Sequence, residues 1–231
     1  MSQDDPVLII TGASTGIGAA TADRAVEFGH RVVLAARSEE KLQALADELG
    51  GEARAIAVRC DVTEWDDHQA LVETTLDRFG RLDAYFANAG FGAKRGFLEE
   101  SVEHWKSMID TNVLGTALSI RSALGHFRKG GSGHFILTSS VAGRRTLPGS
   151  LYSATKHAVT AMGEALRAEI ADTDIKVTLI EPGAVDTPFF DNRPSGALEA
   201  DDIARAVMFA LTQPPHVDVN EILIRPIHQP T

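Results

Sequence analysis

The chain has 231 residues, of which 44% are hydrophobic and 23% are charged, as in an ordinary globular protein. This length suits one layered α/β domain over residues 1–231 and argues against a dinucleotide-binding domain followed by an independent substrate domain. The formal net charge of −10 disfavours nucleic acid and anionic membrane surfaces as partners.

Apolar runs and amphipathic stretches alternate along the chain, which predicts alternating strands and helices. The expected strands cover residues 7–11, 31–36, 53–60, 82–87, 134–138, 176–180 and 221–225. The expected helices cover residues 16–28, 38–49, 64–79, 102–127, 152–171 and 201–211. Strands separated by helices imply right-handed crossovers and a parallel sheet covered on both faces. We therefore expect a three-layer αβα, doubly wound Rossmann fold with a seven-stranded parallel sheet.

A glycine-rich turn, TGASTGIG at residues 11–18, connects the first expected strand to the first helix. Gly12, Gly16 and Gly18 allow a tight turn and let backbone N–H groups approach a pyrophosphate, which the positive end of the helix stabilises. The spacing is not the G-x-G-x-x-G of two-domain dehydrogenases, and the lysine of a P-loop is missing. The turn predicts a dinucleotide site, with a turn that merely needs glycine as the alternative.

The end of the second expected strand bears on the choice of dinucleotide. A carboxylate at this position hydrogen-bonds a ribose 2′-OH, whereas a nearby arginine pairs with a 2′-phosphate. Here Ala36 ends the strand and Arg37 follows it. The sequence therefore favours NADP(H) and leaves NAD(H) possible, and a solvated surface role for Arg37 is the alternative.

Tyr152 and Lys156 are four residues apart at the start of the fifth expected helix, so they lie on one helical face. A nearby ammonium favours the phenolate, which predicts a lowered pKa for Tyr152 and a role as general acid or base. Ser139 and Ser140 follow the preceding strand, at the sheet edge where ligands bind in open α/β folds. A Tyr-x-x-x-Lys pair without this context would be an ordinary surface pair.

Seven motifs together resemble the short-chain dehydrogenase/reductase family in its single-domain form. They occur in the family's order and span nearly the whole chain: TGASTGIG at 11–18, CDVT at 60–63, ANAG at 87–90, Asn112 in TNVLG, SSVAG at 139–143, YSATK at 152–156 and EPGAVDT at 181–187. The resemblance implies the Rossmann fold, a nicotinamide cofactor and a carbonyl or alcohol substrate.

The resemblance also implies a catalytic role for four residues. Tyr152 would donate a proton to the carbonyl oxygen, and Ser140 would hold that oxygen by a hydrogen bond. Lys156 would bind the nicotinamide ribose and lower the pKa of Tyr152, while Asn112 would fix a water that connects Lys156 to solvent. These roles suit hydride transfer, which leaves an alkoxide that needs a positioned acid.

The cofactor site implied by the resemblance is larger and follows the motifs. Asp61 and Val62 would border the adenine. The remaining expected lining residues surround the pyrophosphate, the groove and the nicotinamide amide: Gly12, Ser14, Thr15, Gly16, Ile17, Gly18, Asn88, Ala89, Gly90, Pro182, Gly183, Val185 and Thr187, together with Arg37, Tyr152 and Lys156.

Two features depart from the family pattern. The serine usually stands thirteen residues before the tyrosine, which fits Ser139, whereas Ser140 stands twelve before Tyr152 but fits the S-x-A-G frame. We expect Ser140 to be the catalytic serine. Residues 188–200 are expected to be a loop, shorter than the usual substrate cover, so an accessible substrate pocket is predicted.

These observations predict an NADP(H)-dependent oxidoreductase that interconverts a ketone or aldehyde and the corresponding alcohol. The alternatives are a regulatory module that binds the cofactor without turnover and an epimerase or dehydratase of the same family. The resemblance also implies a homodimer or homotetramer formed through the helices at 102–127 and 152–171.

Several side chains near the expected substrate region leave two interpretations open. Lys94-Arg95 and Arg144-Arg145 would attract a carboxylate or phosphate of the substrate, or they are solvated loop charges. Phe189-Phe190 would form a hydrophobic wall or cover, or it packs against the body of the protein.

Other classes of site receive no support from the sequence. The polar residues 1–6 predict no signal or transit peptide, and no apolar run approaches the about 20 residues of a membrane helix, so we expect a cytoplasmic protein. Cys60 alone excludes an internal disulfide and is expected to be buried. The eight histidines show no metal-ligand spacing, and no serine lies in a G-x-S-x-G elbow, so neither a metal site nor a hydrolase is expected.

Overall fold

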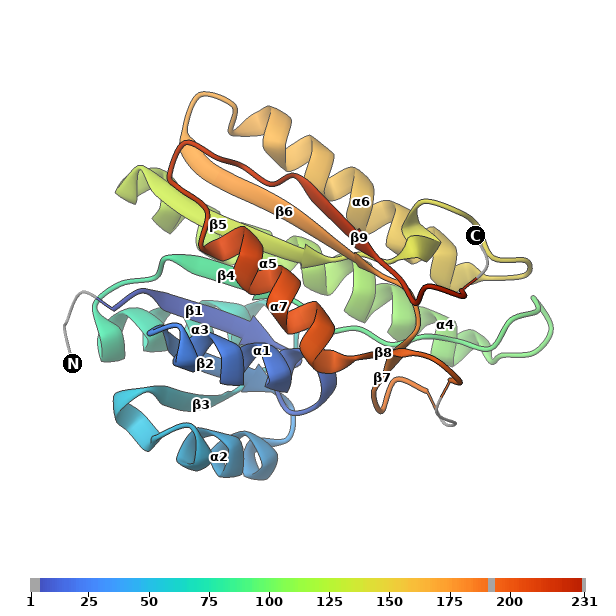
Figure 1. Cartoon of the computed structure of the whole chain (residues 1–231), viewed down its shortest axis with the longest axis horizontal. Coiled ribbons are helices and arrows are strands. Elements are labelled where there is room, and N and C mark those ends of the chain that lie inside the picture. Colours follow the sequence, from blue (N-terminus) through green and yellow to red (C-terminus); the bar gives the residue numbers. More distant parts are fainter. Residues whose placement is uncertain (1–4, 191–193, 230–231) are drawn as a thin grey trace.

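The computed structural model describes residues 5–190 and 194–229, so residues 1–4 of the polar N-terminal stretch and residues 191–193 of the expected loop lie outside the described residues. A parallel sheet of seven strands forms the centre of this part of the chain, as predicted, in the order β3-β2-β1-β4-β5-β6-β9 (Figure 1). The strands are β1 Val7–Thr11, β2 Arg31–Ala36, β3 Ala55–Arg59, β4 Ala84–Ala87, β5 Ser132–Thr138, β6 Asp174–Pro182 and β9 Glu221–Ile224.

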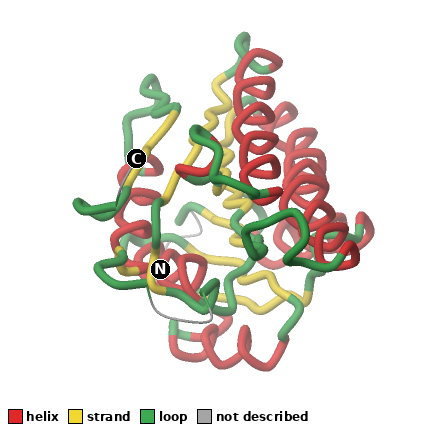
Figure 2. The backbone as a smooth tube through the Cα atoms, turned by 90° about the vertical axis from the view of Figure 1, so that its right-hand side faces the viewer, coloured by secondary structure: helices red, strands yellow, loops and turns green. Residues whose placement is uncertain are grey.

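Helices cover both faces of this sheet, which confirms the predicted αβα layers (Figures 1 and 2). One layer holds α1 Gly16–Glu27, α2 Glu39–Glu48 and α7 Ala200–Leu211, and the other holds α3 Trp65–Phe79, α4 Val102–Ile109, α5 Gly115–Gly130 and α6 Leu151–Glu169. Side chains of a strand point alternately to opposite faces, so Ile9 packs in one core cluster while Leu8 and Ile10 pack in the other. Burial on both sides explains the continuous apolar runs of the strands.

The expected helix over residues 102–127 differs from the structure in its middle. A π-helical turn, Asp110–Leu114, separates α4 from α5, and α5 continues to Gly130. Such a turn widens the helix by one residue and is frequent at functional sites. The sequence did not indicate it because no glycine or proline interrupts residues 102–114.

The expected loop over residues 188–200 is wrong at its C-terminal end. Leu198–Glu199 forms strand β8, which pairs in parallel with strand β7, Val185–Asp186. Strands of two residues are too short to produce a periodic pattern, so the sequence could not reveal them. The small sheet ties the segment after Pro188 back to the segment that follows β6.

The carboxyl ends of β1, β2, β4, β5 and β6 meet at one edge of the sheet because all these strands are parallel. The strand order changes direction between β1 and β4, which is where open α/β sheets bind their ligands. The predicted motifs follow these strand ends, so the fold assembles them along one edge.

Candidate active site

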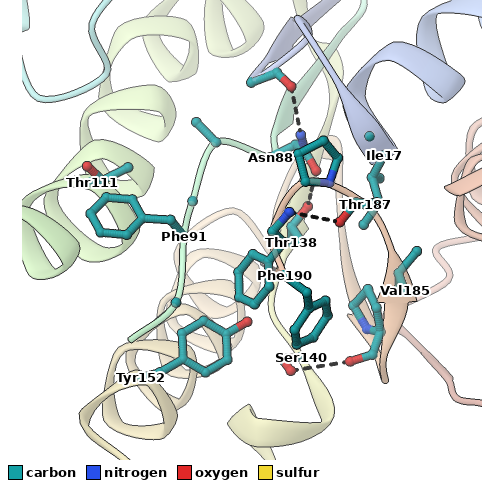
Figure 3. A pocket seen from close by; sticks show the side chains of 18 of the residues that line it. Ile17, Asn88, Phe91, Thr111, Thr138, Ser140, Tyr152, Val185, Thr187 and Phe190 are labelled. Atoms are coloured by element: carbon teal, nitrogen blue, oxygen red, sulfur yellow. Dashed lines mark hydrogen bonds between the residues drawn. The ribbon is translucent and has the colours of Figure 1, made fainter. Parts of the chain in front are cut away.

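A cavity of about 950 Å³ lies at this carboxyl edge of the sheet (Figure 3). All but two of the predicted site residues line it, and the two exceptions are Gly18 and Asn112. The predicted residues on its wall are Gly12, Ser14, Thr15, Gly16, Ile17, Arg37, Asp61, Val62, Asn88, Ala89, Gly90, Ser140, Tyr152, Lys156, Pro182, Gly183, Val185 and Thr187.

The turn between β1 and α1 requires glycine for different reasons at different positions. Gly12 and Gly16 have φ angles of 66° and 58°, in the left-handed region that side chains disfavour. A Cβ atom on Gly18 would lie 2.3 Å from the carbonyl oxygen of Gly12, so this glycine lets α1 pack closely on the turn. Gly18 lies in the first turn of α1 and is absent from the cavity lining, so it supports the cavity from behind.

Asn88 joins three strands beside the turn. Its Nδ2 donates a hydrogen bond of 3.1 Å to the Thr11 carbonyl. Its Oδ1 accepts one of 3.2 Å from the Thr138 hydroxyl (Figure 3). The backbone N–H of Asn88 also donates to the Thr11 hydroxyl. Thr11 and Thr138 were missed by the sequence interpretation, since their role depends on the neighbouring strands.

Arg37 and Asp61 face the cavity from the ends of β2 and β3. Burial raises the pKa of Asp61, but hydrogen bonds from the N–H and hydroxyl of Thr63, helped by the charges of Arg37 and Arg59, outweigh it and hold that pKa below its usual value. Arg37 is exposed and forms no ion pair or hydrogen bond within residues 5–190 and 194–229. The ends of β2 and β3 therefore present to the cavity an ionised carboxylate and a guanidinium that is unpaired among the described residues.

Ser139 and Ser140 point to different partners although they are adjacent. The Ser139 hydroxyl donates to the Lys156 carbonyl at 3.1 Å and lies 2.8 Å from the Thr160 hydroxyl, so it attaches α6 to the end of β5. The Ser140 hydroxyl donates to the Pro182 carbonyl at 3.2 Å and accepts from the Ala142 N–H. Of the two serines, Ser140 is the one whose hydroxyl influences the pKa of Tyr152.

Tyr152 and Lys156 project from the first two turns of α6. Burial raises the pKa of Tyr152 to about 12, and the Ser140 hydroxyl offsets this rise only in part. Burial likewise lowers the pKa of Lys156 to about 8. The expectation that Lys156 lowers the pKa of Tyr152 is wrong in this structure, because desolvation determines both values and the Lys156 Nζ donates to the Thr138 carbonyl instead.

Asn112 lies in the π-helical turn and is 1% exposed. Its Oδ1 accepts from the Phe91 N–H at 3.0 Å, and its Nδ2 donates to the Phe91 carbonyl at 2.9 Å and to the Thr155 hydroxyl at 3.1 Å. Asn112 therefore positions the backbone of Phe91, which lines the cavity, and attaches it to α6.

The end of the cavity beyond Tyr152 is apolar. Phe189 meets the Tyr152 ring edge-on with centroids 5.6 Å apart and packs against Phe190 at 5.0 Å. Leu147 and Phe91 also line the cavity. Of the two interpretations of Phe189-Phe190, the structure shows the wall, and both rings are 39% exposed, so the wall is open to solvent.

The four cations Lys94, Arg95, Arg144 and Arg145 have different surroundings in the structure. Arg144 is engaged by Glu181, Glu221 and Glu164, so it fits neither of its two interpretations, a cation for a substrate anion or a solvated loop charge. Arg95 lines the cavity, whereas Lys94 and Arg145 are exposed residues outside its lining.

The described part of the chain offers neither a cluster of metal ligands nor a membrane-spanning helix. Residues 5–190 and 194–229 contain no group of three or more His, Cys, Asp or Glu side chains that could hold a metal ion. No helix in the same residues combines the length and the hydropathy needed to cross a membrane.

Comparisons with known proteins agree with this geometry. A family model described as short chain dehydrogenase matches residues 6–197. An uncharacterized oxidoreductase of Staphylococcus haemolyticus is 43% identical over 225 residues, which cover 96% of this chain and 97% of that protein.

Two solved structures superpose along nearly the whole chain. An alcohol dehydrogenase from Thermococcus sibiricus, complexed with 5-hydroxy-NADP, has a TM-score of 0.88 at 31% identity and covers 99% of both chains. A short chain dehydrogenase/reductase from Burkholderia phymatum in complex with NAD has a TM-score of 0.86 at 28% identity, with 96% of this chain and 90% of that chain covered.

Proposed function

This chain belongs to the short-chain dehydrogenase family of oxidoreductases, and we propose that it interconverts a ketone or aldehyde and the corresponding alcohol by hydride transfer with NADP(H). The observation that carries the proposal is the meeting of Ser140, Tyr152 and Lys156 in the same cavity as the glycine turn. The reaction needs a proton donor beside the carbonyl oxygen and a cofactor site within reach, and this cavity offers candidates for both.

The residues present fit a nicotinamide dinucleotide. Gly12 and Gly16 leave backbone at the cavity wall where a Cβ atom would meet Ala89 or Thr187 at 2.9 and 3.1 Å. The first turn of α1 starts at Gly16 without a side-chain cap from Thr15, which suits a pyrophosphate at this helix N-terminus. When bound, the cofactor would supply or accept the hydride.

The preference for NADP(H) rests on Arg37. Its guanidinium, without a partner among the described residues, is suited to a 2′-phosphate, whereas no carboxylate ends β2 to bind a ribose 2′-hydroxyl. The similar structures carry 5-hydroxy-NADP in one protein and NAD in the other, which supports a nicotinamide cofactor here.

The chain's own residues would then handle the proton. Tyr152, with a pKa of about 12, is protonated at neutral pH and would donate to the carbonyl oxygen during reduction. Ser140 would hold that oxygen by a hydrogen bond. Lys156 would bind the nicotinamide ribose, and Asn112 would keep a water path to Lys156 in addition to holding Phe91.

The substrate proposed here is a small carbonyl or alcohol compound with an apolar part against Phe189 and Phe190. Arg95 at the cavity wall would additionally attract an anionic group of that substrate.

We propose that the protein is a homodimer or homotetramer and that each chain folds as one domain. We also propose that it is located in the cytoplasm. The large apolar side chains Val102, Ile109 and Leu114 are 54%, 41% and 46% exposed along α4 and the π-helical turn, which supports association through this helix.

The test is a screen of ketones, aldehydes and alcohols with NADPH, NADH and their oxidised forms, followed by cofactor absorbance. Consumption of NADPH by at least one carbonyl compound is expected. Tight NADPH binding with no turnover on any compound would instead favour the regulatory module, and turnover without net cofactor consumption would favour an epimerase or dehydratase.

A further inference from the structure

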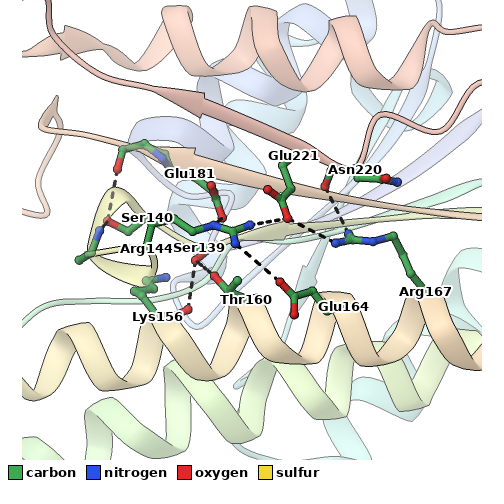
Figure 4. A network of polar contacts seen from close by, with 12 residues as sticks. Ser139, Ser140, Arg144, Lys156, Thr160, Glu164, Arg167, Glu181, Asn220 and Glu221 are labelled. Carbon is green, nitrogen blue, oxygen red and sulfur yellow. Dashed lines mark hydrogen bonds and ion pairs between the residues drawn. The ribbon is translucent and has the colours of Figure 1, made fainter. Parts of the chain in front are cut away.

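An ion-pair cluster lies behind the turn that carries Ser140 (Figure 4). Arg144 follows this turn, and its Nε donates to the Glu181 carboxylate at 2.6 Å. Glu181 is 1% exposed and sits in β6 directly before Pro182. The contact therefore joins the turn after β5 to the end of the neighbouring strand, through a carboxylate that is out of reach of water.

Further charges surround Arg144 from two other elements. Its guanidinium also pairs with Glu221 at the start of β9 and lies 3.6 Å from Glu164 of α6. Arg167 of α6 adds a second cation, 3.5 Å from the Glu221 carboxylate. Arg144 thus connects the turn with β6, β9 and α6 at once.

The pair closes a ring that contains the candidate catalytic serine. The Ser140 hydroxyl donates to the carbonyl of Pro182, and Pro182 is bonded to Glu181. The backbone from Ser140 to Arg144 and the Arg144–Glu181 contact complete the ring. A shift of either side of the ion pair would change the position of the Ser140 hydroxyl against Pro182.

The opposite side of the turn is held by packing. A Cβ atom on Gly143 would lie 2.4 Å from the Ser139 hydroxyl and 2.7 Å from the Lys156 carbonyl, so the turn is seated closely on α6. The Ser139 N–H also donates to the Ile180 carbonyl at 2.8 Å. At the C-terminal end of this turn, the Arg144–Glu181 pair holds the backbone against β6.

From this arrangement we propose that Arg144 and Glu181 are positioning residues, which hold Ser140 and the segment that starts at Pro182 in register for the reaction. The proposal rests on the proposed function. Stability alone explains the pair poorly, because desolvating two charges offsets most of their attraction, and apolar residues of similar volume often replace buried ion pairs without loss of stability. An error of about 1 Å in a reacting group can cost about 100-fold in rate.

The deciding variant is Arg144→Met/Glu181→Gln, which removes both charges and leaves no uncompensated buried carboxylate. We expect this variant to fold and its NADPH dissociation constant, measured by fluorescence titration, to stay within about threefold of that of the unmodified enzyme. Its kcat should fall about 10- to 100-fold on the carbonyl compound that the unmodified enzyme reduces best. Arg128→Met, which breaks the exposed Arg128–Glu169 pair on α5 and α6, is the matched control and should leave kcat unchanged. A kcat of the double variant within threefold of the unmodified enzyme would overturn the proposal.

A second arm does not depend on the double variant or on turnover. Arg144→Lys keeps the charge but not the guanidinium fork, and hydrogen exchange of the peptide over residues 139–147 should become about tenfold faster in it, without a change in peptides of β1 or α3. Unchanged exchange in that peptide would contradict the positioning role even if the double variant does not fold. If neither the unmodified enzyme nor the variants turn over any substrate but exchange in the Arg144→Lys protein is faster, the proposed function is refuted. The role of the ring of contacts in holding the turn would still stand.

Discussion

The ammonium of Lys156 lies 5.7 Å from the centroid of the Tyr152 ring, over its face, and donates its hydrogen bond to the Thr138 carbonyl. The two side chains share one helical face, as their spacing predicts, yet the ammonium contacts the end of β5 and not the phenol oxygen. Two groups whose pKa values are shifted in opposite directions therefore stand side by side at the cavity wall.

The first prediction concerns the proton donor. Tyr152→Phe should leave the NADPH dissociation constant within about threefold and reduce kcat by about 100- to 10,000-fold, because general acid catalysis contributes about this much. Steady-state kinetics and fluorescence titration measure the two effects. Tyr85→Phe, at the chain's other tyrosine, is the matched control, since that hydroxyl contacts His68 in the core and should not affect kcat. Full activity of Tyr152→Phe would disprove the proposed mechanism.

The second prediction concerns cofactor choice. Arg37→Ala should weaken NADPH binding about 10- to 100-fold and change NADH binding little, because a charge-assisted hydrogen bond contributes about 1.5–3 kcal/mol. Titration of both cofactors against the variant measures this difference. Lys41→Ala, an exposed cation of α2 outside the cavity lining, should alter neither affinity. Equal losses for NADPH and NADH would argue against a 2′-phosphate contact.

The third prediction concerns pH. Reduction requires a protonated Tyr152 and a charged Lys156, and the lower of their two pKa values, about 8 for Lys156, sets the limit. The value of kcat/KM, which reports the free enzyme, should be constant below this pH and fall about tenfold per pH unit above it. The Lys156→Met enzyme should have a low kcat/KM, and its pH profile should not bend near pH 8. A profile of the unmodified enzyme that stays flat to pH 10 would contradict this assignment.

The fourth prediction concerns the glycine turn. Gly18→Ala places a Cβ atom 2.3 Å from the Gly12 carbonyl oxygen, so α1 must move away from the turn, and both thermal stability and NADPH affinity should fall. Gly125→Ala in α5 meets no atom within 4 Å and should stabilise the protein by about 0.5–1 kcal/mol through helix propensity. Thermal denaturation of both variants provides the comparison, and an unaffected Gly18→Ala protein would refute the packing argument.

The fifth prediction concerns the substrate. If Arg95 attracts an anionic group, Arg95→Met should raise KM about tenfold for a keto acid and leave KM for the corresponding methyl ester unchanged. Lys94→Met is a matched control, since Lys94 is the neighbouring cation and lies outside the cavity lining. Identical effects of Arg95→Met on acid and ester would show that Arg95 is a solvated rim residue.

Much of the fold followed from local patterns. Buried parallel strands need continuous apolar runs, and crossover helices need amphipathic ones, so the seven strands and the αβα layers were predictable without knowledge of any contact. The errors arose where local sequence carries no signal, in the π-helical turn at Asp110–Leu114 and in the two-residue strands β7 and β8.

The sequence by itself determined the glycine turn, the spacing of Tyr152 and Lys156, and the cation after β2, because each depends on neighbours within one turn or one strand end. Only the tertiary structure decided which of two adjacent serines influences the pKa of Tyr152, since successive residues point in different directions and their partners come from other elements. It also decided that Arg144 belongs to Glu181, 37 residues away, and not to a substrate. The pKa values of Tyr152 and Lys156 likewise depended on burial, which spacing along a helix cannot reveal.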